Sequence, residues 1–272
     1  MHFREAIKIL LDNGVEDAIY DARMIFSRIG GIPEWQLVGN NPKATEAVEK
    51  AIMRRAEREP LQYILGEVLF FGESYTVSPD CLIPRADTEI LVEYAVSHIP
   101  QGSVFADLCT GSGCVAISTL CHTKSTKAIA VDISDGALTI ARQNAERANV
   151  TDRIALKKAD ILDCEPYELI QGESIFAVLS NPPYVKSSVY EELEPEIYHE
   201  PRLAFVGGED GCDFYRAITA KYKNAIDRNG FIAYEIGYDQ AEALIAIAAD
   251  CGMSCEIIND LSGNPRVAVL KN

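Results

Sequence analysis

Apolar residues in the first sixty positions recur every three or four residues. This spacing places them on one face of a helix, and it predicts helices over residues 3–12, 16–29 and 45–58. Turn-forming residues separate the three segments, at Gly14, Gly30, Gly31, Pro33 and Pro42. We therefore expect the chain to begin with a small helical bundle.

The pattern changes after Leu61. Two short runs of β-type residues, Val68–Phe71 and Tyr75–Val77, surround Gly72 and predict a β-hairpin. From Val104 onward, strand-like runs alternate with helical runs, as strands at 104–108, 127–132, 153–158, 175–180 and 231–236 and helices at 114–120, 135–148 and 238–250. Such alternation predicts a parallel sheet covered by helices, because parallel strands need crossover connections.

The last two strand-like runs, 253–258 and 266–270, have only a short turn-rich stretch between them, so we expect them to pair antiparallel. The chain then divides into a helical domain (1–65), a β-hairpin linker (66–85) and a larger α/β domain (86–272) with a mostly parallel, Rossmann-like, seven-stranded sheet. Its 272 residues suit two domains.

No run approaches the roughly 20 apolar residues that cross a bilayer, and the N-terminus lacks the apolar core of a signal peptide. The sequence therefore indicates a cytoplasmic protein without a membrane partner. The eight cysteines include no C-x-x-C pair and no grouping with histidine at zinc-ligand spacing, so we expect buried, reduced thiols and no metal site.

Acidic residues outnumber basic ones by 41 to 25, a net charge of −16. The excess is concentrated in residues 86–272, which hold 28 acidic and 15 basic side chains. Such a charge repels a phosphate backbone, and the short basic run at 54–58 contains an acid and is expected to be a solvated helix face. No direct nucleic-acid footprint is expected.

A glycine loop, Asp107-Leu-Cys-Thr-Gly-Ser-Gly113, follows a predicted strand and opens a predicted helix. Free backbone N–H groups at a helix start bind anionic groups, and Asp132, about 20 residues on, is placed to bind ribose hydroxyls. The loop alone fits either NAD or S-adenosyl-L-methionine. Asp107 would repel a pyrophosphate but tolerates a sulfonium and an ammonium, which favours S-adenosyl-L-methionine, with S-adenosyl-L-homocysteine as product.

Asp160 and Ile161 follow the third predicted strand of the sheet. At that position the carboxylate would accept from the exocyclic amine of an adenine, and the isoleucine would pack on its ring. A solvated loop acid is the alternative interpretation of Asp160.

The tetrapeptide Asn181-Pro182-Pro183-Tyr184 directly follows the strand at 175–180, at the ligand-binding edge of the sheet. A carboxamide nitrogen is a poor nucleophile because its lone pair is delocalised. The Asn181 side-chain oxygen and the Pro182 carbonyl would accept its N–H groups, and Tyr184 would stack on the planar target. The tetrapeptide therefore predicts methylation of a planar nitrogen.

Several segments together resemble the peptide chain release factor N5-glutamine methyltransferases (the PrmC/HemK family). They are Pro60 to Gly66, Phe71-Gly72, Leu82 to Glu89, the glycine loop, Asn181 to Tyr184, Glu200 to Ala204 and Asn264 to Val267. The resemblance extends over nearly the whole chain.

The resemblance implies a class I methyltransferase domain behind a helical substrate-docking domain, acting in translation termination on the glutamine of the Gly-Gly-Gln motif of release factors. By position, the cofactor contacts would be Thr110, Gly111, Ser112, Gly113, Asp132, Ile161 and Asn181, and the glutamine contacts Asn181, Pro182, Pro183 and Tyr184. The chain departs from the family at Cys109, where glycine is usual, and the thiol is expected to narrow the approach to the methionine moiety.

Asp87 or Thr88 is expected to cap the helix that begins near residue 88, and Arg85 is not expected to be catalytic. The alternatives are a methyltransferase for a ribosomal-protein glutamine, a DNA or RNA amino-methyltransferase, a nicotinamide oxidoreductase and a non-catalytic cofactor-binding module.

Overall fold

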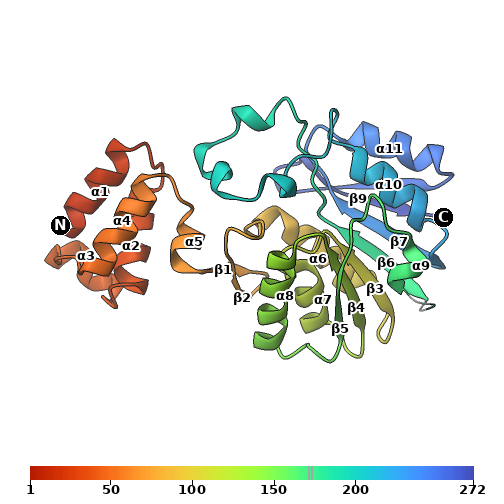
Figure 1. The fold of residues 1–272 in the computed structure, drawn as a ribbon, viewed down its shortest axis with the longest axis horizontal. Coiled ribbons are helices and arrows are strands. Elements are labelled where there is room, and N and C mark those ends of the chain that lie inside the picture. Colours follow the sequence, from red (N-terminus) through yellow and green to blue (C-terminus); the bar gives the residue numbers. More distant parts are fainter. Residues whose placement is uncertain (171, 173) are drawn as a thin grey trace. The chain divides into compact units, whose positions relative to one another are not determined.

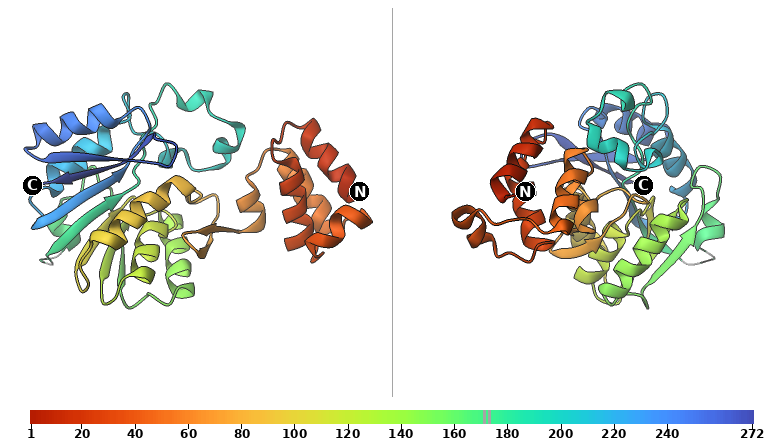
Figure 2. Two further views of the ribbon diagram at one scale, coloured as in Figure 1. Left: turned by 180° about the vertical axis from the view of Figure 1, so that it is seen from behind. Right: turned by 60° about the vertical axis from the view of Figure 1, so that its left-hand side comes forward.

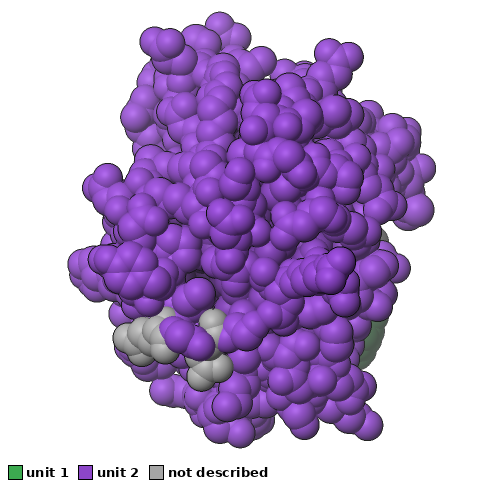
Figure 3. All heavy atoms as spheres, turned by 90° about the vertical axis from the view of Figure 1, so that its right-hand side faces the viewer, with its two compact units in different colours: residues 1–68, 194–199 green, residues 69–193, 200–272 purple. Residues whose placement is uncertain are grey.

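The computed structural model describes residues 1–170, 172 and 174–272. The chain forms two compact units, one of residues 1–68 with 194–199 and one of residues 69–193 with 200–272 (Figure 3). The second unit holds most of the chain. The six residues at 194–199 belong to the first unit although they follow it by more than a hundred positions.

The first unit is a bundle of short helices. They are α1 (Phe3–Asp12), α2 (Ala18–Arg28), α3 (Glu34–Asn40), α4 (Glu46–Ala56), α5 (Leu61–Leu65) and the 3-10 turn η3 (Pro195–His199). Phe3 and Phe26 meet edge to face at 5.2 Å in its core. The three predicted helices are confirmed, whereas α3 and α5 were missed, because one or two turns are too short for a helical repeat to be visible.

The hairpin predicted after the bundle is confirmed. Its strands are β1 (Glu67–Phe70) and β2 (Glu73–Thr76), which pair as a two-stranded sheet. The turn between them passes through Phe71 and Gly72, both at positive φ.

The second unit is built on a seven-stranded sheet of order β5-β4-β3-β6-β7-β9-β8 within the described residues. Its strands are β3 (Val104–Leu108), β4 (Lys127–Asp132), β5 (Ile154–Lys158), β6 (Ile175–Ser180), β7 (Ile226–Glu235), β8 (Ser254–Asn259) and β9 (Pro265–Lys271). β3 to β7 pair in parallel, and β9 runs antiparallel to both β7 and β8. The predicted fold class, including the antiparallel end, is confirmed.

Helices cover both faces of this sheet (Figures 1 and 2). On one face lie α6 (Glu89–His98), α7 (Cys114–His122) and α8 (Asp135–Arg147), and on the other α10 (Asp213–Tyr222) and α11 (Ala241–Asp250). A short helix, α9 (Pro166–Ile170), precedes β6. The strands are buried from both sides, and Phe105, Leu108 and Val178 are fully inaccessible.

The sheet reverses its order between β3 and β6. β4 and β5 extend it to one side of β3, and β7 extends it from β6 to the other. Ligands of such sheets bind at this point, beyond the carboxyl ends of the strands. The glycine loop follows β3 and Asn181 follows β6, so the fold brings the two motifs to the same place.

Two other predictions from the sequence concern membrane-spanning helices and the cysteines. None of the helices in the described ranges is both long and apolar enough to cross a membrane. Of the eight cysteines, Cys81, Cys114 and Cys212 are buried and Cys121 is exposed, so the expectation of buried thiols was wrong in part.

Candidate active site

The glycine loop is held from below by Asp107. This side chain is buried, and its Oδ2 accepts from the Thr110 hydroxyl at 2.6 Å and from the Ala116 backbone N–H at 3.1 Å. Burial raises the pKa of Asp107 to about 7, although both hydrogen bonds act in the other direction. Asp107 therefore connects Thr110, in the middle of the loop, to the first turn of α7.

Cys109 occupies a backbone conformation that glycine favours. Its φ is +61°, in the left-handed region where a Cβ atom costs about 1 kcal/mol. Cys109 lines the pocket beside the loop, and its narrowing of the approach to the methionine moiety stays a prediction. The glycine that is usual at this position in the resembling family would adopt the same turn without strain.

Asp132 ends β4 beside the loop. Its Oδ2 accepts from the Gly111 N–H at 2.8 Å and its Oδ1 from the Ser134 N–H at 2.9 Å. Burial raises the pKa of Asp132, and these backbone bonds reduce the rise. Each carboxylate oxygen keeps a further lone pair, so Asp132 can still accept from a pair of hydroxyl groups.

A pocket of about 750 Å³ lies over the carboxyl ends of the strands, a size typical of small-molecule sites. Five residues predicted to bind the cofactor line it, Gly111, Asp132, Asp160, Ile161 and Asn181. Asp160 accepts from the Leu162 N–H at 2.9 Å, and Ile161 presents an almost buried apolar surface. The assignment of Asp132 to a ribose and of Asp160 and Ile161 to an adenine stays a prediction.

The other three predicted cofactor residues do not line the pocket. The Thr110 hydroxyl is used by Asp107, Ser112 is buried, and Gly113 opens α7 at positive φ. They shape the loop beneath the pocket.

The charge of the pocket distinguishes among ligands. Its acidic lining residues are Asp80, Asp132, Asp160 and Asp213, against one basic residue, Arg202. An acidic lining repels a pyrophosphate and attracts a sulfonium and an ammonium. The residues present therefore fit S-adenosyl-L-methionine better than a dinucleotide.

The Asn181 to Tyr184 segment leaves β6 at the edge of this pocket. Asn181 and Pro183 line it, whereas Pro182 is buried behind them and Tyr184 is half-buried outside it. The Asn181 Nδ2 donates to the Thr88 hydroxyl at 3.1 Å, and that hydroxyl donates to Glu235 Oε2 at 2.5 Å. The Tyr184 hydroxyl donates to Glu235 Oε1 at 3.1 Å. One carboxylate thus holds both ends of the segment.

Neither Thr88 nor Glu235 was identified as a site residue from the sequence. Thr88 is the N-cap residue of α6, as expected, but its hydroxyl donates to Glu235 and makes no capping bond, and Asp87 pairs with Arg266 at 3.3 Å. Glu235 could have been noticed in the sequence, since it is an acid that directly follows the buried run 230–234 at the end of β7. Such a residue needs polar partners.

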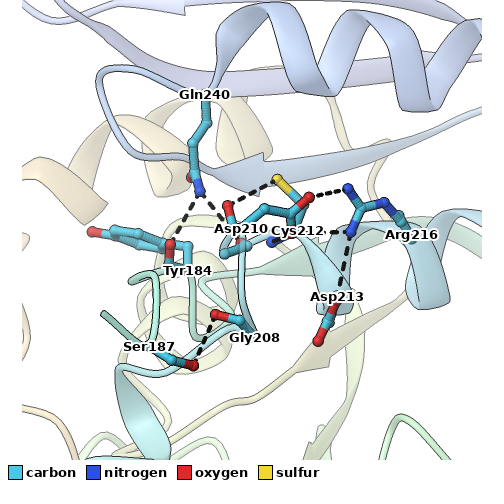
Figure 4. Close-up of polar contacts among 9 residues, drawn as sticks. Tyr184, Ser187, Gly208, Asp210, Cys212, Asp213, Arg216 and Gln240 are labelled. Atoms are coloured by element: carbon cyan, nitrogen blue, oxygen red, sulfur yellow. Dashed lines mark hydrogen bonds and ion pairs between the residues drawn. The ribbon is translucent and has the colours of Figure 1, made fainter. Parts of the chain in front are cut away.

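The backbone of the same segment is clamped from the other side (Figure 4). Gln240, which is buried, donates from Nε2 to the Tyr184 carbonyl at 3.0 Å and to the Gly211 carbonyl at 3.3 Å. Gly207 and Gly211 pack so closely that a Cβ atom would lie 2.3 Å from the Pro183 carbonyl oxygen and 2.2 Å from that of Tyr184. Only glycine fits at these two positions, so the segment is tightly held.

Three other family-like segments, 82–89, 200–204 and 264–267, are joined to one another by polar contacts. Glu200 is buried, accepts from the Ile83 N–H at 2.9 Å and pairs with Arg85. Arg266 pairs with Asp87 and with Asp260 at 3.1 Å. Arg85 is thereby used in an ion pair.

The sheet order, the acid that ends β4 and the acidic pocket over the carboxyl ends of the strands define an S-adenosylmethionine-dependent class I methyltransferase. Two family models match the chain, the PrmC N-terminal domain at residues 3–66 and a methyltransferase domain at residues 91–172.

Relatives identify the family. The release factor glutamine methyltransferase of Geobacter sulfurreducens is 34% identical over 95% of this chain and 91% of its own length. That of Thermodesulfovibrio yellowstonii is 36% identical over 93% and 92%. The solved structure of a ribosomal protein L11 methylase from Lactobacillus delbrueckii, 17% identical, shares the fold with a TM-score of 0.51 over 72% of this chain and 83% of that one. This chain belongs to the release factor glutamine methyltransferase family, which confirms the resemblance.

Proposed function

We propose that this protein transfers a methyl group to the side-chain amide nitrogen (N5) of the glutamine in the Gly-Gly-Gln motif of peptide chain release factors. The observation that carries the proposal is the orientation of Asn181. Its amide nitrogen is committed to Thr88, which leaves its Oδ1 as an acceptor at the edge of the pocket. An amide N–H is the group that such an acceptor binds.

S-adenosyl-L-methionine, when bound, supplies a methyl group on a sulfonium, whose carbon–sulfur electron pair returns to sulfur as the methyl leaves. Asp132 is proposed to hold the ribose hydroxyls, Asp160 and Ile161 the adenine, and Gly111 the loop edge next to the methionine part. Their positions in the lining of the pocket support these roles.

Asn181 and the Pro182 carbonyl are proposed to accept the two N–H bonds of the target amide. That arrangement points the nitrogen lone pair at the methyl group, and the nitrogen releases one proton to solvent as its bond to carbon forms. Fixed geometry of this kind can contribute roughly 7 to 11 kcal/mol to lowering a barrier. Tyr184 is proposed to flank the planar target, with its hydroxyl held by Glu235.

The first unit is proposed to dock the protein substrate. Its exposed apolar side chains include Ile19, Tyr20 and Trp35, and a partner that covers such groups gains binding energy. Trp35→Ala should raise the KM for a release factor and leave kcat unchanged, whereas Leu261→Ala, at an exposed apolar site in the second unit, should change neither. An unchanged KM for Trp35→Ala contradicts the docking role of this surface. Because release factors act on ribosomes, the reaction is proposed to occur in the cytoplasm.

The decisive experiment is to incubate the protein with trideuteromethyl-labelled S-adenosylmethionine and a purified release factor. Peptide mass spectrometry should locate one label on the Gly-Gly-Gln glutamine, and a release factor with that glutamine changed to alanine should stay unlabelled. Labelling of ribosomal proteins but not of the release factor would overturn the substrate. Labelling of DNA or RNA alone would overturn the class of acceptor.

A further inference from the structure

Glu235 is a buried carboxylate that lies behind the Asn181 to Tyr184 segment and does not line the pocket. It is the last residue of β7 and is 2% exposed. Its Oε2 accepts from Thr88 at 2.5 Å and its Oε1 from Tyr184 at 3.1 Å. Among the described residues, Glu235 has two hydroxyl partners and no ion pair. Burying an acid with such partners costs free energy of folding.

The direction of each hydrogen bond in the chain Glu235–Thr88–Asn181 follows from the carboxylate. An ionised carboxylate can only accept, and a threonine hydroxyl has a single proton to donate. Thr88 therefore donates its proton to Glu235 and accepts a hydrogen bond from Asn181. Asn181 must donate that bond from its NH₂ group. The carbonyl end of the Asn181 amide then faces away from Thr88.

We propose that Glu235 is a positioning residue for methyl transfer: as a carboxylate it sets the direction of the bonds through Thr88 and so presents Asn181 as an acceptor to the target amide. This inference rests on the proposed function. Tyr184 is oriented by the same group, so one buried charge aligns both ends of the segment.

Protonation of Glu235 would remove this directionality. Its carboxyl could then donate to Thr88, whose hydroxyl would donate to the Asn181 carbonyl oxygen, and the NH₂ group would turn to the substrate. Burial raises the pKa of Glu235 to about 7, against the hydrogen bonds from Thr88 and Tyr184. The other titratable or charged groups that act on it are Asp87, Arg266, Tyr215 and Cys114.

The test compares Glu235→Gln with Glu242→Gln, a matched change at an exposed position of α11. With the cofactor and release factor saturating, Glu235→Gln should lower kcat about 10- to 100-fold, the range for loss of a hydrogen bond to a charged group. Affinity for S-adenosylmethionine should stay within about two-fold by calorimetry, because Glu235 does not line the pocket. Glu242→Gln should retain wild-type values.

Thr88 provides the internal control. Thr88→Val should lower kcat as Glu235→Gln does, and Thr88→Ser, which keeps the hydroxyl, should retain most activity. The double variant Thr88→Val/Glu235→Gln should be no worse than the poorer single variant, because both break the same chain of bonds. Additive losses in the double variant would overturn the chain as the route of the effect.

The pH profile separates orientation from folding. Wild-type kcat should rise through an apparent pKa near 7, and Glu235→Gln should lose that rise. Asp107 titrates in the same range, but it holds the glycine loop and is present in both proteins. Wild-type kcat in Glu235→Gln at every pH would overturn the proposal.

An NMR measurement made without substrate tests this inference separately from the proposed function. The side-chain amide signals of Asn181, assigned with Asn181→Ala by ¹⁵N NMR, should shift on acidification in the wild type and not in Glu235→Gln. Such a shift supports the bond direction even if release factors prove not to be the substrate. Identical signals in both proteins at all pH values would overturn it.

Discussion

Glu196 in the first unit and Glu235 in the second are both withdrawn from bulk water, yet they meet opposite kinds of partner. Glu196 Oε1 accepts from Arg55 at 3.0 Å and from Arg58 at 2.7 Å, and its Oε2 accepts from Arg58 at 2.7 Å. Within the described part of the chain, the side chain of Glu235 accepts only from the hydroxyls of Thr88 and Tyr184. One carboxylate is neutralised by cations, and the other is aligned by neutral donors.

The pKa values move in opposite directions for this reason. Burial raises the pKa of Glu196, but hydrogen bonds from Arg58 and Arg55 outweigh it and leave the pKa below its ordinary value. At Glu235 burial prevails, and the pKa rises to about 7. The difference teaches that paired charge serves to hold segments together, whereas unpaired charge is tolerated where its one-way acceptance orients a neighbour.

The largest expected effect is on kcat when Asn181, the last residue in the chain of hydrogen bonds from Glu235, is changed. Asn181→Ala removes the acceptor for the target amide, so kcat should fall about 10²- to 10³-fold, as for loss of one preorganised polar group in other active sites. Cofactor affinity measured by calorimetry should remain detectable. Asn259→Ala, at an exposed position ending β8, is the matched control. Wild-type turnover in Asn181→Ala would refute the role of Asn181.

The raised pKa of Glu235 should appear in stability. The folded state binds its proton more tightly than the unfolded state, so the free energy of unfolding is highest below the ordinary pKa of 4.5 and falls until about pH 7. At 1.36 kcal/mol per pKa unit the loss is about 3 kcal/mol. Urea unfolding should show a smaller decline from pH 5 to pH 8 for Glu235→Gln than for wild type. Equal declines would mean that Glu235 does not titrate in this range.

Asp132 is a third type of carboxylate, held by backbone N–H groups. Asp132→Ala should weaken S-adenosylmethionine binding by about 1.5 to 3 kcal/mol, the value of a hydrogen bond to a charged group. Calorimetry measures this directly, and Asp135→Ala, an exposed neighbour in α8, should bind as wild type does. Unchanged affinity would remove Asp132 from the cofactor site.

Removing the Glu196 carboxylate should lower the free energy of unfolding without changing the pH dependence of kcat. Glu196→Gln leaves Arg55 and Arg58 without their shared carboxylate. Buried pairs lose about 3 to 5 kcal/mol in this way, but the 18% exposure of the Glu196 side chain reduces the expectation to about 1 to 2 kcal/mol. Urea unfolding at pH 7 should show this loss, and Glu191→Gln in the exposed turn η2 (Tyr190–Glu192) should not.

The sign of the Glu196 effect with pH is opposite to that of Glu235. A lowered pKa contributes stability above the unfolded-state pKa, and that contribution is lost as the pH falls through the folded-state value. The difference between wild type and Glu196→Gln should therefore shrink as the pH falls below 4.5. A difference that grew on acidification would contradict the two-arginine contact.

The smallest expected effect concerns Cys109. Cys109→Gly relieves a side chain at φ +61° and should raise the free energy of unfolding by about 0.5 to 1 kcal/mol, the strain less the added entropy of glycine in the unfolded chain. Cys109→Ser keeps the strain and is the control. Urea unfolding that ranks Cys109→Gly below Cys109→Ser would contradict this account.

Local patterns were enough to predict the elements that carry the site. The first helix was predicted at residues 3–12, where α1 lies, because its apolar residues recur with the period of a helix. Asn181 was placed at the sheet edge because it directly follows a buried apolar strand. Asp132 was found by its spacing from the glycine loop, which the βαβ geometry imposes.

What the sequence did not reveal depends on distant pairs. Thr88 and Glu235 are 147 positions apart, and Arg58 and Glu196 are 138 apart, so no local repeat connects them. The run at 54–58 was expected to be a solvated helix face, and that was wrong in part: Arg54 and Glu57 are exposed, but Arg55 is buried between Asp21 and Glu196. The partners of Arg55 lie far along the chain, so the local sequence does not reveal them.

The discontinuity of the first unit has a consequence for biosynthesis. Residues 1–68 leave the ribosome early, but the segment at 194–199 follows about 130 residues later. At a bacterial elongation rate of roughly 5 to 20 residues per second, Glu196 emerges about 7 to 26 s after Val68. Throughout that interval Arg58 has no Glu196 to accept from it, so the nascent helices must wait for the methyltransferase unit to be nearly two-thirds synthesised before their own fold is complete.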